Sequence, residues 1–194
     1  MKKHIVLILN MLISLVLVEC TASGTNLNSY VDPSLDLSLM HKIALIPMKN
    51  SEFSNSEIRI IDQKIETAIH NINSDIVVIP SVNADYLLDT YKLKALWLNF
   101  LDNYNSSGIP DKNDLILFGD AFKIDAMIYG KIVNIHQVNG RDAFYGVEDT
   151  YGGNEGMTKV TVKYVMLSTK KGILLWESSF EGVKKTRAIK VPAP

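Results

Sequence analysis

Hydrophobic and polar residues alternate in different ways along the chain, and each pattern predicts an element of structure. Two short apolar runs that end in proline, residues 41–47 and 75–80, are typical of buried strands. Between them isoleucines recur every three or four residues, which predicts a helix with one apolar face. These isoleucines are Ile58, Ile61, Ile65, Ile69 and Ile72. Strand, helix and strand in this order predict a parallel βαβ unit.

The second half of the chain predicts two further helices and then only strands. Residues 83–104 place leucines and aromatic residues roughly on one helical face, and residues 114–125 predict a short helix after a polar loop. Three strands follow, at residues 125–138, 157–167 and 172–180, and a turn joins the last two as a hairpin. In the middle one of these strands, apolar and polar residues alternate, which indicates a sheet with one covered face.

Together these elements predict an α+β sandwich, in which a mixed sheet of about five strands carries its helices on one side. At 194 residues and 47% hydrophobic residues, the chain is long enough for one domain with additional segments. We assign the domain to residues 39–184. Residues 20–38, rich in Ser, Thr and Asn, are expected to form a flexible tether, and residues 185–194 a C-terminal tail.

The amino terminus has the pattern of an export signal. Residues 1–4 carry two lysines, and residues 5–18 are apolar apart from Asn10 and Ser14. This stretch is too short for a bilayer core of about 30 Å, which takes roughly 20 apolar residues. We therefore expect residues 1–19 to be a signal peptide that is removed.

Cys20 is the single cysteine of the chain and follows the apolar stretch directly. Leu17 and Cys20 resemble the lipobox of bacterial lipoproteins, in which the cysteine is acylated and becomes the first residue; Glu19 stands where that motif has a small residue. A lipid on Cys20 would also explain an unpaired cysteine in an exported protein. Cleavage after Ala22 and an unmodified thiol are the alternatives.

The resemblance to lipoproteins also implies a location. Thr21 after the cysteine resembles the default outer-membrane sorting signal of enteric bacteria. We therefore expect a lipid-anchored protein of the bacterial cell envelope, on the outer membrane and facing the periplasm.

A second resemblance rests on Asp125, Gly130, Gly172 and Trp176. A short helix, an aspartate at its end, a strand with a central glycine and a hairpin strand of the form Gly-Ile-Leu-Leu-Trp are similar to the amino-terminal domain of TolB. They are also similar to the curli-secretion and penicillin-binding-protein-activator lipoproteins. The resemblance covers residues 41–182 and implies an α+β fold and a noncatalytic envelope role. From packing alone, we expect Gly130 to permit a bulge or close approach, and Trp176 to be a core residue.

Few residues suggest chemistry. His41, His70 and His136 lie in separate elements without metal-ligand spacing, which argues against a metal site, and no motif indicates a cofactor. Ser168 and Lys171 have the S-x-x-K spacing of penicillin-recognising enzymes but lie in a predicted turn and lack the partner motifs. A net charge of −1 gives no basic surface for nucleic acid.

Residues 139–156 combine glycines, acidic residues and aromatic residues. This composition is typical of a mobile connection between strands, and exposed aromatic residues there could also contact a partner, in which case Phe144, Tyr145 and Tyr151 would do so. Calcium is a third alternative, although the spacing of a calcium-binding loop is missing.

The sequence thus favours a membrane-tethered, non-enzymatic interaction module that docks on another envelope protein through the 139–156 loop and an open sheet edge, with a homo-oligomer as a further option. A domain that binds a small molecule or a peptidoglycan fragment is the alternative, with a cleft near Tyr91, Trp97 and Tyr104 as its expected site. A hydrolase comes third.

Overall fold

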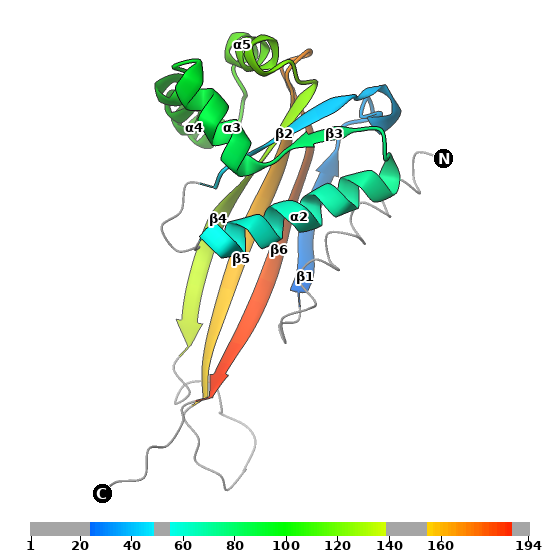
Figure 1. The fold of residues 1–194 in the computed structure, drawn as a ribbon. Coiled ribbons are helices and arrows are strands. Elements are labelled where there is room, and N and C mark those ends of the chain that lie inside the picture. The colour runs from blue at the N-terminus through cyan, green and yellow to red at the C-terminus, as the bar shows by residue number, and fades with distance from the viewer. Residues whose placement is uncertain (1–23, 49–54, 139–154, 188–194) are drawn as a thin grey trace, which may run out of the picture.

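The computed structural model describes residues 24–48, 55–138 and 155–187, which form a mixed six-stranded sheet with helices against both of its faces (Figure 1). The strands are β1 (Gly24–Val31), β2 (Lys42–Ile46), β3 (Val77–Ile79), β4 (Ala126–Val138), β5 (Glu155–Ser168) and β6 (Ile173–Arg187). The helices are the short 3-10 helix η1 (Leu37–Leu39), α2 (Asn55–Ile72), α3 (Ser81–Thr90), α4 (Lys94–Ser107) and α5 (Lys112–Phe122). The predicted α+β sandwich is confirmed.

The strand order is β1-β6-β5-β4-β2-β3, and β2 is parallel to both of its neighbours. The predicted βαβ unit is therefore present, with α2 as its crossover helix. Ile43 and Leu45 of β2 point to one face of the sheet, and Ala44 and Ile46 to the other. All four are buried, which explains why the sequence of β2 is apolar without alternation.

The helices are divided between the two faces, and the prediction that they all pack on one side is wrong. On one face, Ile65 and Ile69 of α2 share a core with Ile128 and Met166. On the other face, α3, α4 and α5 bury a larger core that includes Met127, which lies next to Ile128 in β4. In Figure 1, α2 crosses in front of the sheet, whereas α3, α4 and α5 gather near its upper end. Helical periodicity shows that a helix has an apolar face, but not which side of the sheet it covers.

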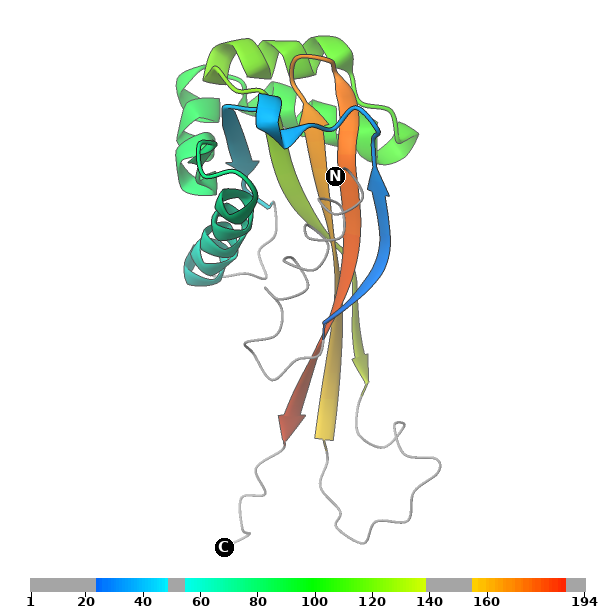
Figure 2. The ribbon, with the colours of Figure 1, turned by 90° about the vertical axis from the view of Figure 1, so that its right-hand side faces the viewer.

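β4, β5 and β6 continue well past the helices and form a three-stranded arm (Figure 2). β5 lies in the middle and is antiparallel to both β4 and β6. At the helical end, Val165, Met166 and Leu167 of β5 are buried in succession, because both faces are covered there. The predicted pattern of one covered face does not hold for that end of β5.

The predicted tether of residues 20–38 is wrong for residues 24–31, which form β1, antiparallel to β6 at the edge of the sheet. β1 pairs along β6 from Gly182 to Trp176. An edge strand is stabilised mainly by its main-chain hydrogen bonds and needs no apolar alternation. The polar composition of this segment therefore concealed the strand.

The predicted helix of residues 83–104 is two helices, α3 and α4, which are separated at residues 91–93. Lys92 has a φ of 57°, in the left-handed region. Its N–H donates to the carbonyl of Asp89, and the N–H of Leu93 donates to the carbonyl of Leu88, the two bonds of a Schellman motif. Glycine usually occupies such a position, so a lysine there gave no signal of a helix end.

Candidate functional site

Within the part of the chain that the structure describes, one long sheet edge is open along β4. β4 pairs with β2 only at positions 126–129, whereas it pairs with β5 along its whole length. At residues 130–138, no strand among the described residues lies against the outer edge of β4. The main-chain N–H and C=O groups of such an edge are available to a further strand.

The edge opens at this point because β2 ends there. Ile46 pairs with Tyr129, so the next residue, Pro47, would come opposite Gly130. Proline has no backbone N–H and cannot continue the ladder as a donor. The proline that ends this apolar run in the sequence therefore also marks the start of the open edge.

Val133 lies at a β-bulge within the open edge. The pairing of β4 with β5 shifts by one residue between Ile132 and Asn134, which leaves Val133 without a partner in β5. Its side chain is 55% exposed. Bulges increase local twist and re-aim side chains, and here the bulge leaves an apolar side chain exposed on the edge strand.

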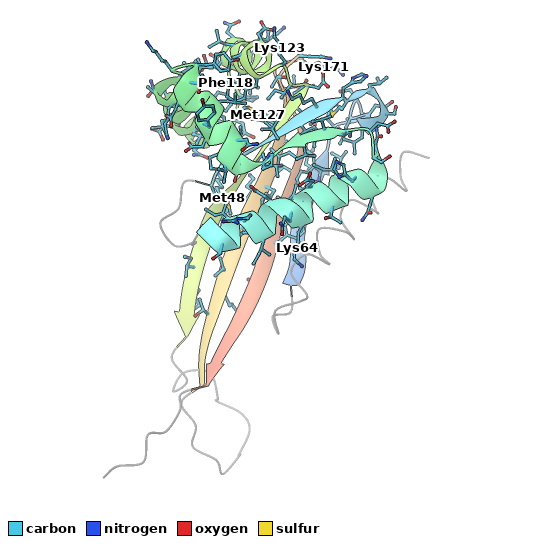
Figure 3. The ribbon with its side chains drawn as sticks, in the orientation of Figure 1. Met48, Lys64, Phe118, Lys123, Met127 and Lys171 are labelled. Carbon is cyan, nitrogen blue, oxygen red and sulfur yellow. The ribbon has the colours of Figure 1, made fainter. Side chains whose placement is uncertain are left out.

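A pocket of about 170 Å³ lies where β2 ends and the open edge of β4 begins. Its walls come from the end of β2, from α4 and from β4. The lining residues are Pro47, Met48, Leu98, Leu101, Asp102, Asn105, Tyr129, Gly130, Lys131 and Ile132. Most of them are apolar, and the charged groups are Asp102 and Lys131. Figure 3 shows Met48 beside β4, near the beginning of α2.

Lys131 carries a partly buried positive charge in this pocket. Its Nζ donates a hydrogen bond to Oδ1 of Asn105 on α4, at 2.6 Å. Burial lowers the pKa of Lys131 and the nearby Lys163 lowers it further, while Glu177 acts in the opposite direction. Glu177 is itself 2.6 Å from Lys163. Lys131 makes no ion pair with any of the described residues.

The hydroxyl of Tyr129 is buried next to the pocket. The residue is 3% exposed, and its hydroxyl has no hydrogen-bond partner among the described residues. Its ring packs edge-on against Trp97, with the ring centroids 5.7 Å apart, and against Tyr104 at 6.3 Å. Burial raises the pKa of Tyr129, so the phenol stays protonated at neutral pH.

The described residues do not form the predicted cleft near Tyr91, Trp97 and Tyr104. Trp97 is 4% exposed and Tyr104 6%, and both belong to the core beneath α4. Tyr91 is exposed and contacts Phe122 instead, with 6.1 Å between the ring centroids. The pocket lies on a different side of α4, next to Leu98 and Leu101.

Asp125 is the first of the four residues on which the resemblance to the TolB amino-terminal domain rests. It stabilises the end of the sheet opposite the arm. Its carboxylate accepts hydrogen bonds from the backbone N–H groups of His41, at 2.7 Å, and Lys42, at 3.0 Å. Nζ of Lys170, in the β5–β6 turn, lies 2.5 Å from the other oxygen. Burial opposes ionisation of Asp125, but these hydrogen bonds outweigh it and lower its pKa. Its role is structural, because it ties the start of β2 to the turn between β5 and β6.

The other residues of that pattern also serve packing. A Cβ on Gly130 would lie 2.7 Å from both Sδ of Met48 and Cε1 of Tyr164, so glycine is needed for close approach. Gly172 has a φ of 67° in the β5–β6 turn, where Lys112 leaves no room for a side chain. Trp176 is 2% exposed and lies in the core beneath α2, as expected for a core residue.

The structure describes Ser168, Lys171 and the three histidines that the sequence analysis considered for chemistry. Ser168 ends β5, and its hydroxyl accepts a hydrogen bond from the N–H of Lys171 in the predicted turn, at 3.0 Å. His41, His70 and His136 are exposed and lie in separate elements. No group of three His, Cys, Asp or Glu side chains in the described ranges could hold a metal ion.

Several predicted residues lie outside the described residues. They are Cys20, Phe144, Tyr145 and Tyr151, so the predicted lipid anchor and the predicted 139–156 contact loop stay predictions. Of the helices between residues 24 and 187 that are described, none is long and apolar enough to cross a membrane.

No protein-family model and no curated protein match this chain. Solved structures that match this chain include the lipoprotein GNA1162 from Neisseria meningitidis, at a TM-score of 0.38 and 14% identity over 78% of this chain and 87% of that one. The PelC dodecamer from Paraburkholderia phytofirmans has a TM-score of 0.36 and 13% identity, covering 84% and 83% of the two chains. The LpoB C-terminal domain from Salmonella enterica has a TM-score of 0.35 and 9% identity over 78% and 84%. These low scores establish neither a shared family nor a shared activity.

Proposed function

We propose that the protein is a non-enzymatic lipoprotein of the bacterial envelope whose α+β domain binds a partner protein by strand addition at the outer edge of β4. The observation that carries this proposal is the open edge at residues 130–138, which starts where Pro47 ends β2. Proteins usually shorten, cover or charge such edges, because exposed edges pair with other chains. An uncovered edge beside an apolar pocket is the arrangement that strand addition uses.

The edge also offers contacts that can select a partner. An added strand gains main-chain hydrogen bonds from β4, and these bonds are independent of the partner's sequence. The exposed side chain of Val133 and the pocket beside Lys131 supply side-chain contacts on either side of the bulge. Specificity would come from these side-chain contacts.

The lipid anchor in this proposal is on Cys20. Each buried methylene contributes about 0.8 kcal/mol to membrane binding, so more than one acyl chain gives a stable anchor. Only three residues separate Cys20 from Gly24, the first residue of β1. A chain spans at most roughly 3.5 Å per residue. The anchor would therefore hold the start of β1 within about 15 Å of the membrane surface, and the domain would act close to the membrane.

Site-specific photo-crosslinking in the native host tests the proposal. A photoreactive amino acid at Asn134, exposed beside the bulge, should give a discrete crosslinked product with one protein. The same amino acid at Gln63, exposed on α2, is the control and should not give that product. Val133→Pro should reduce the product at least fivefold, because bulges tolerate proline while the ring interferes with an added strand.

Two results would overturn the proposal. One is equal crosslinking from Asn134 and Gln63, and the other is full crosslinking in a folded Val133→Pro variant. The anchor is tested separately by mass spectrometry of the purified mature protein, which should show an acylated Cys20 at its amino terminus. An unmodified thiol would refute the anchor without affecting the edge.

A further inference from the structure

The pocket and the open edge are one continuous surface. Gly130, Lys131 and Ile132 line the pocket and also begin the open edge of β4. A strand added to β4 there would follow the line that β2 leaves at Pro47. Its side chains alternate between the two faces of the sheet. Those on the α4 side would pass over the pocket, because α4 supplies one of its walls.

The size of the pocket favours one side chain over a free small molecule. Sites for drug-sized ligands typically enclose about 300–1,000 Å³, whereas this pocket measures about 170 Å³. Its walls include Met48, Leu98 and Leu101, which present apolar surface. An apolar side chain of an added strand would be desolvated there, and burying it fully is worth about 1.5–3 kcal/mol.

The charge of the pocket favours an acidic neighbour beside that apolar side chain. Lys131 is partly buried and hydrogen-bonded to Asn105, and the neighbouring Lys163 is already paired with Glu177. Asp102 also lines the pocket, but its side chain is exposed, so water and salt screen its charge. A carboxylate brought to Lys131 would therefore meet a less screened positive charge.

We propose that the partner presents an extended segment in which an apolar anchor residue fills the pocket and an adjacent acidic residue pairs with Lys131. This inference rests on the proposed function, since it names the kind of segment that pairs with β4. It assigns a new role to Leu101 and Lys131, which together would select the segment.

Variants of the pocket in the full-length lipoprotein test this inference, with the Asn134 crosslink as the readout. Leu101→Trp fills the pocket, and Lys131→Glu reverses its charge. Each should reduce the crosslinked product at least fivefold. Lys131→Arg keeps the charge and should stay within twofold of the unchanged protein. Leu117→Trp, which places the same ring on the exposed side of α5, is the matched control and should also stay within twofold.

The identity of the partner segment completes the test. Mass spectrometry should place the crosslink in a segment with an acidic residue next to an apolar one. Replacing that acidic residue by lysine should restore crosslinking to the Lys131→Glu variant. Thermal unfolding checks that Leu101→Trp is folded. If it is not, the comparison of Lys131→Glu with Lys131→Arg tests the inference.

The possible failures are distinguishable. If Val133→Pro removes the crosslink while folded Leu101→Trp and Lys131→Glu keep it, the pocket inference is overturned and the edge proposal stands. If none of these variants changes the crosslink, both are overturned. Loss of the product with Lys131→Arg as well as Lys131→Glu would show that charge is not what the pocket recognises, which also refutes the inference.

Discussion

The carboxylate of Asp62 on α2 accepts two hydrogen bonds from Ser81, the first residue of α3. The backbone N–H of Ser81 donates at 2.9 Å, and its hydroxyl donates at 2.5 Å to the same oxygen. Asp62 is 8% exposed and Ser81 1%. This pair links the two helices that cover opposite faces of the sheet, and it supplies the side-chain acceptor that the amino terminus of α3 otherwise lacks.

Removing the acceptor should destabilise the domain more than removing its charge. Asp62→Ala leaves two buried donors of Ser81 without an acceptor and should lower the free energy of unfolding by about 1–3 kcal/mol. Asp62→Asn keeps an oxygen acceptor and should lose less than half as much. Denaturant unfolding of the mature chain with Cys20→Ala measures both. Equal losses would show that the charge, and not the acceptor, matters.

The same pair predicts a pH dependence. Burial raises the pKa of Asp62 from 3.8, and the hydrogen bonds from Ser81 only partly oppose this. The folded state therefore binds the proton of Asp62 more tightly than the unfolded state does. The stabilisation that comes from this protonation is complete below pH 3.8 and is lost as the pH rises through the pKa of the folded state. The stability of Asp62→Asn relative to the unchanged protein should rise over that interval. Parallel pH profiles would contradict this prediction.

Asp125 should show the opposite pH dependence. Hydrogen bonds from Lys170, His41 and Lys42 lower its pKa below 3.8, despite its burial. Its contribution to stability is therefore present above pH 3.8 and is lost as the pH falls through the folded pKa. Asp125→Asn should be destabilised by about 1–3 kcal/mol at pH 7, with a flatter profile below pH 4.

Lys170→Ala is the matched control for Asp125. The lysine is 68% exposed, so losing its ion pair should cost less than about 1 kcal/mol. Urea unfolding between pH 2.5 and 7 measures both variants. A larger loss of unfolding free energy for Lys170→Ala than for Asp125→Asn would contradict this prediction. It would mean that the ion pair, and not the backbone hydrogen bonds, stabilises the link between the start of β2 and the β5–β6 turn.

The core of the fold was predictable from hydrophobic pattern. The continuous apolarity of β2 correctly indicated burial on both faces, and the isoleucine period correctly placed α2. Besides the side of the sheet that each helix covers, two features were not predictable. β1 is held at an edge by main-chain bonds and has a polar sequence, and the break between α3 and α4 occurs at a lysine where glycine would have marked it.

The candidate site was predictable only in part. Gly130 stood out in the sequence as part of the pattern shared with other lipoproteins. Glycine is needed there because Met48 and Tyr164 approach closely, and that approach depends on tertiary packing. Lys131 and Asn105 come together because α4 packs on β4, and nothing in their spacing indicates it. Pro47 was the usable signal, because a proline that ends a buried strand leaves the neighbouring strand open beyond it.

Gly130→Ala should be destabilising because of this close approach. Met48 is flexible and can move away from an added Cβ, but the ring of Tyr164 lies 2.7 Å from that position and is held within the sheet. We expect a loss of about 1–3 kcal/mol, typical of overpacking. Gly182→Ala is the control, since its nearest neighbour is 4.0 Å away, and it should change stability by less than about 0.5 kcal/mol.

Adding Met48→Ala to Gly130→Ala identifies the source of the strain. The double variant should recover only part of the loss, because Tyr164 still blocks the added methyl group. Full recovery would show that Met48 alone requires a glycine at this position. Urea unfolding of the unchanged protein, Gly130→Ala, Met48→Ala and the double variant in parallel gives the required free energies.

Lys92→Gly should stabilise the protein. A residue other than glycine in the left-handed region costs roughly 1–2 kcal/mol, while glycine adds entropy to the unfolded chain. Lys92, with a φ of 57°, is exposed, and no hydrogen bond or ion pair of its side chain links it to the described residues. We therefore expect a net gain of about 0.5–1 kcal/mol.

Gln63→Gly, in the middle of α2, provides the matched control for Lys92→Gly. It should lose about 1 kcal/mol, because that position is helical and gains nothing from the freedom of glycine. Lys123, which ends α5 with a φ of 56°, offers a second test of the same kind. If Lys92→Gly and Lys123→Gly both lose stability as Gln63→Gly does, the two helix ends do not adopt the left-handed conformation in solution. The division of residues 81–107 into α3 and α4, which positions α4 beside the pocket, would then be in question.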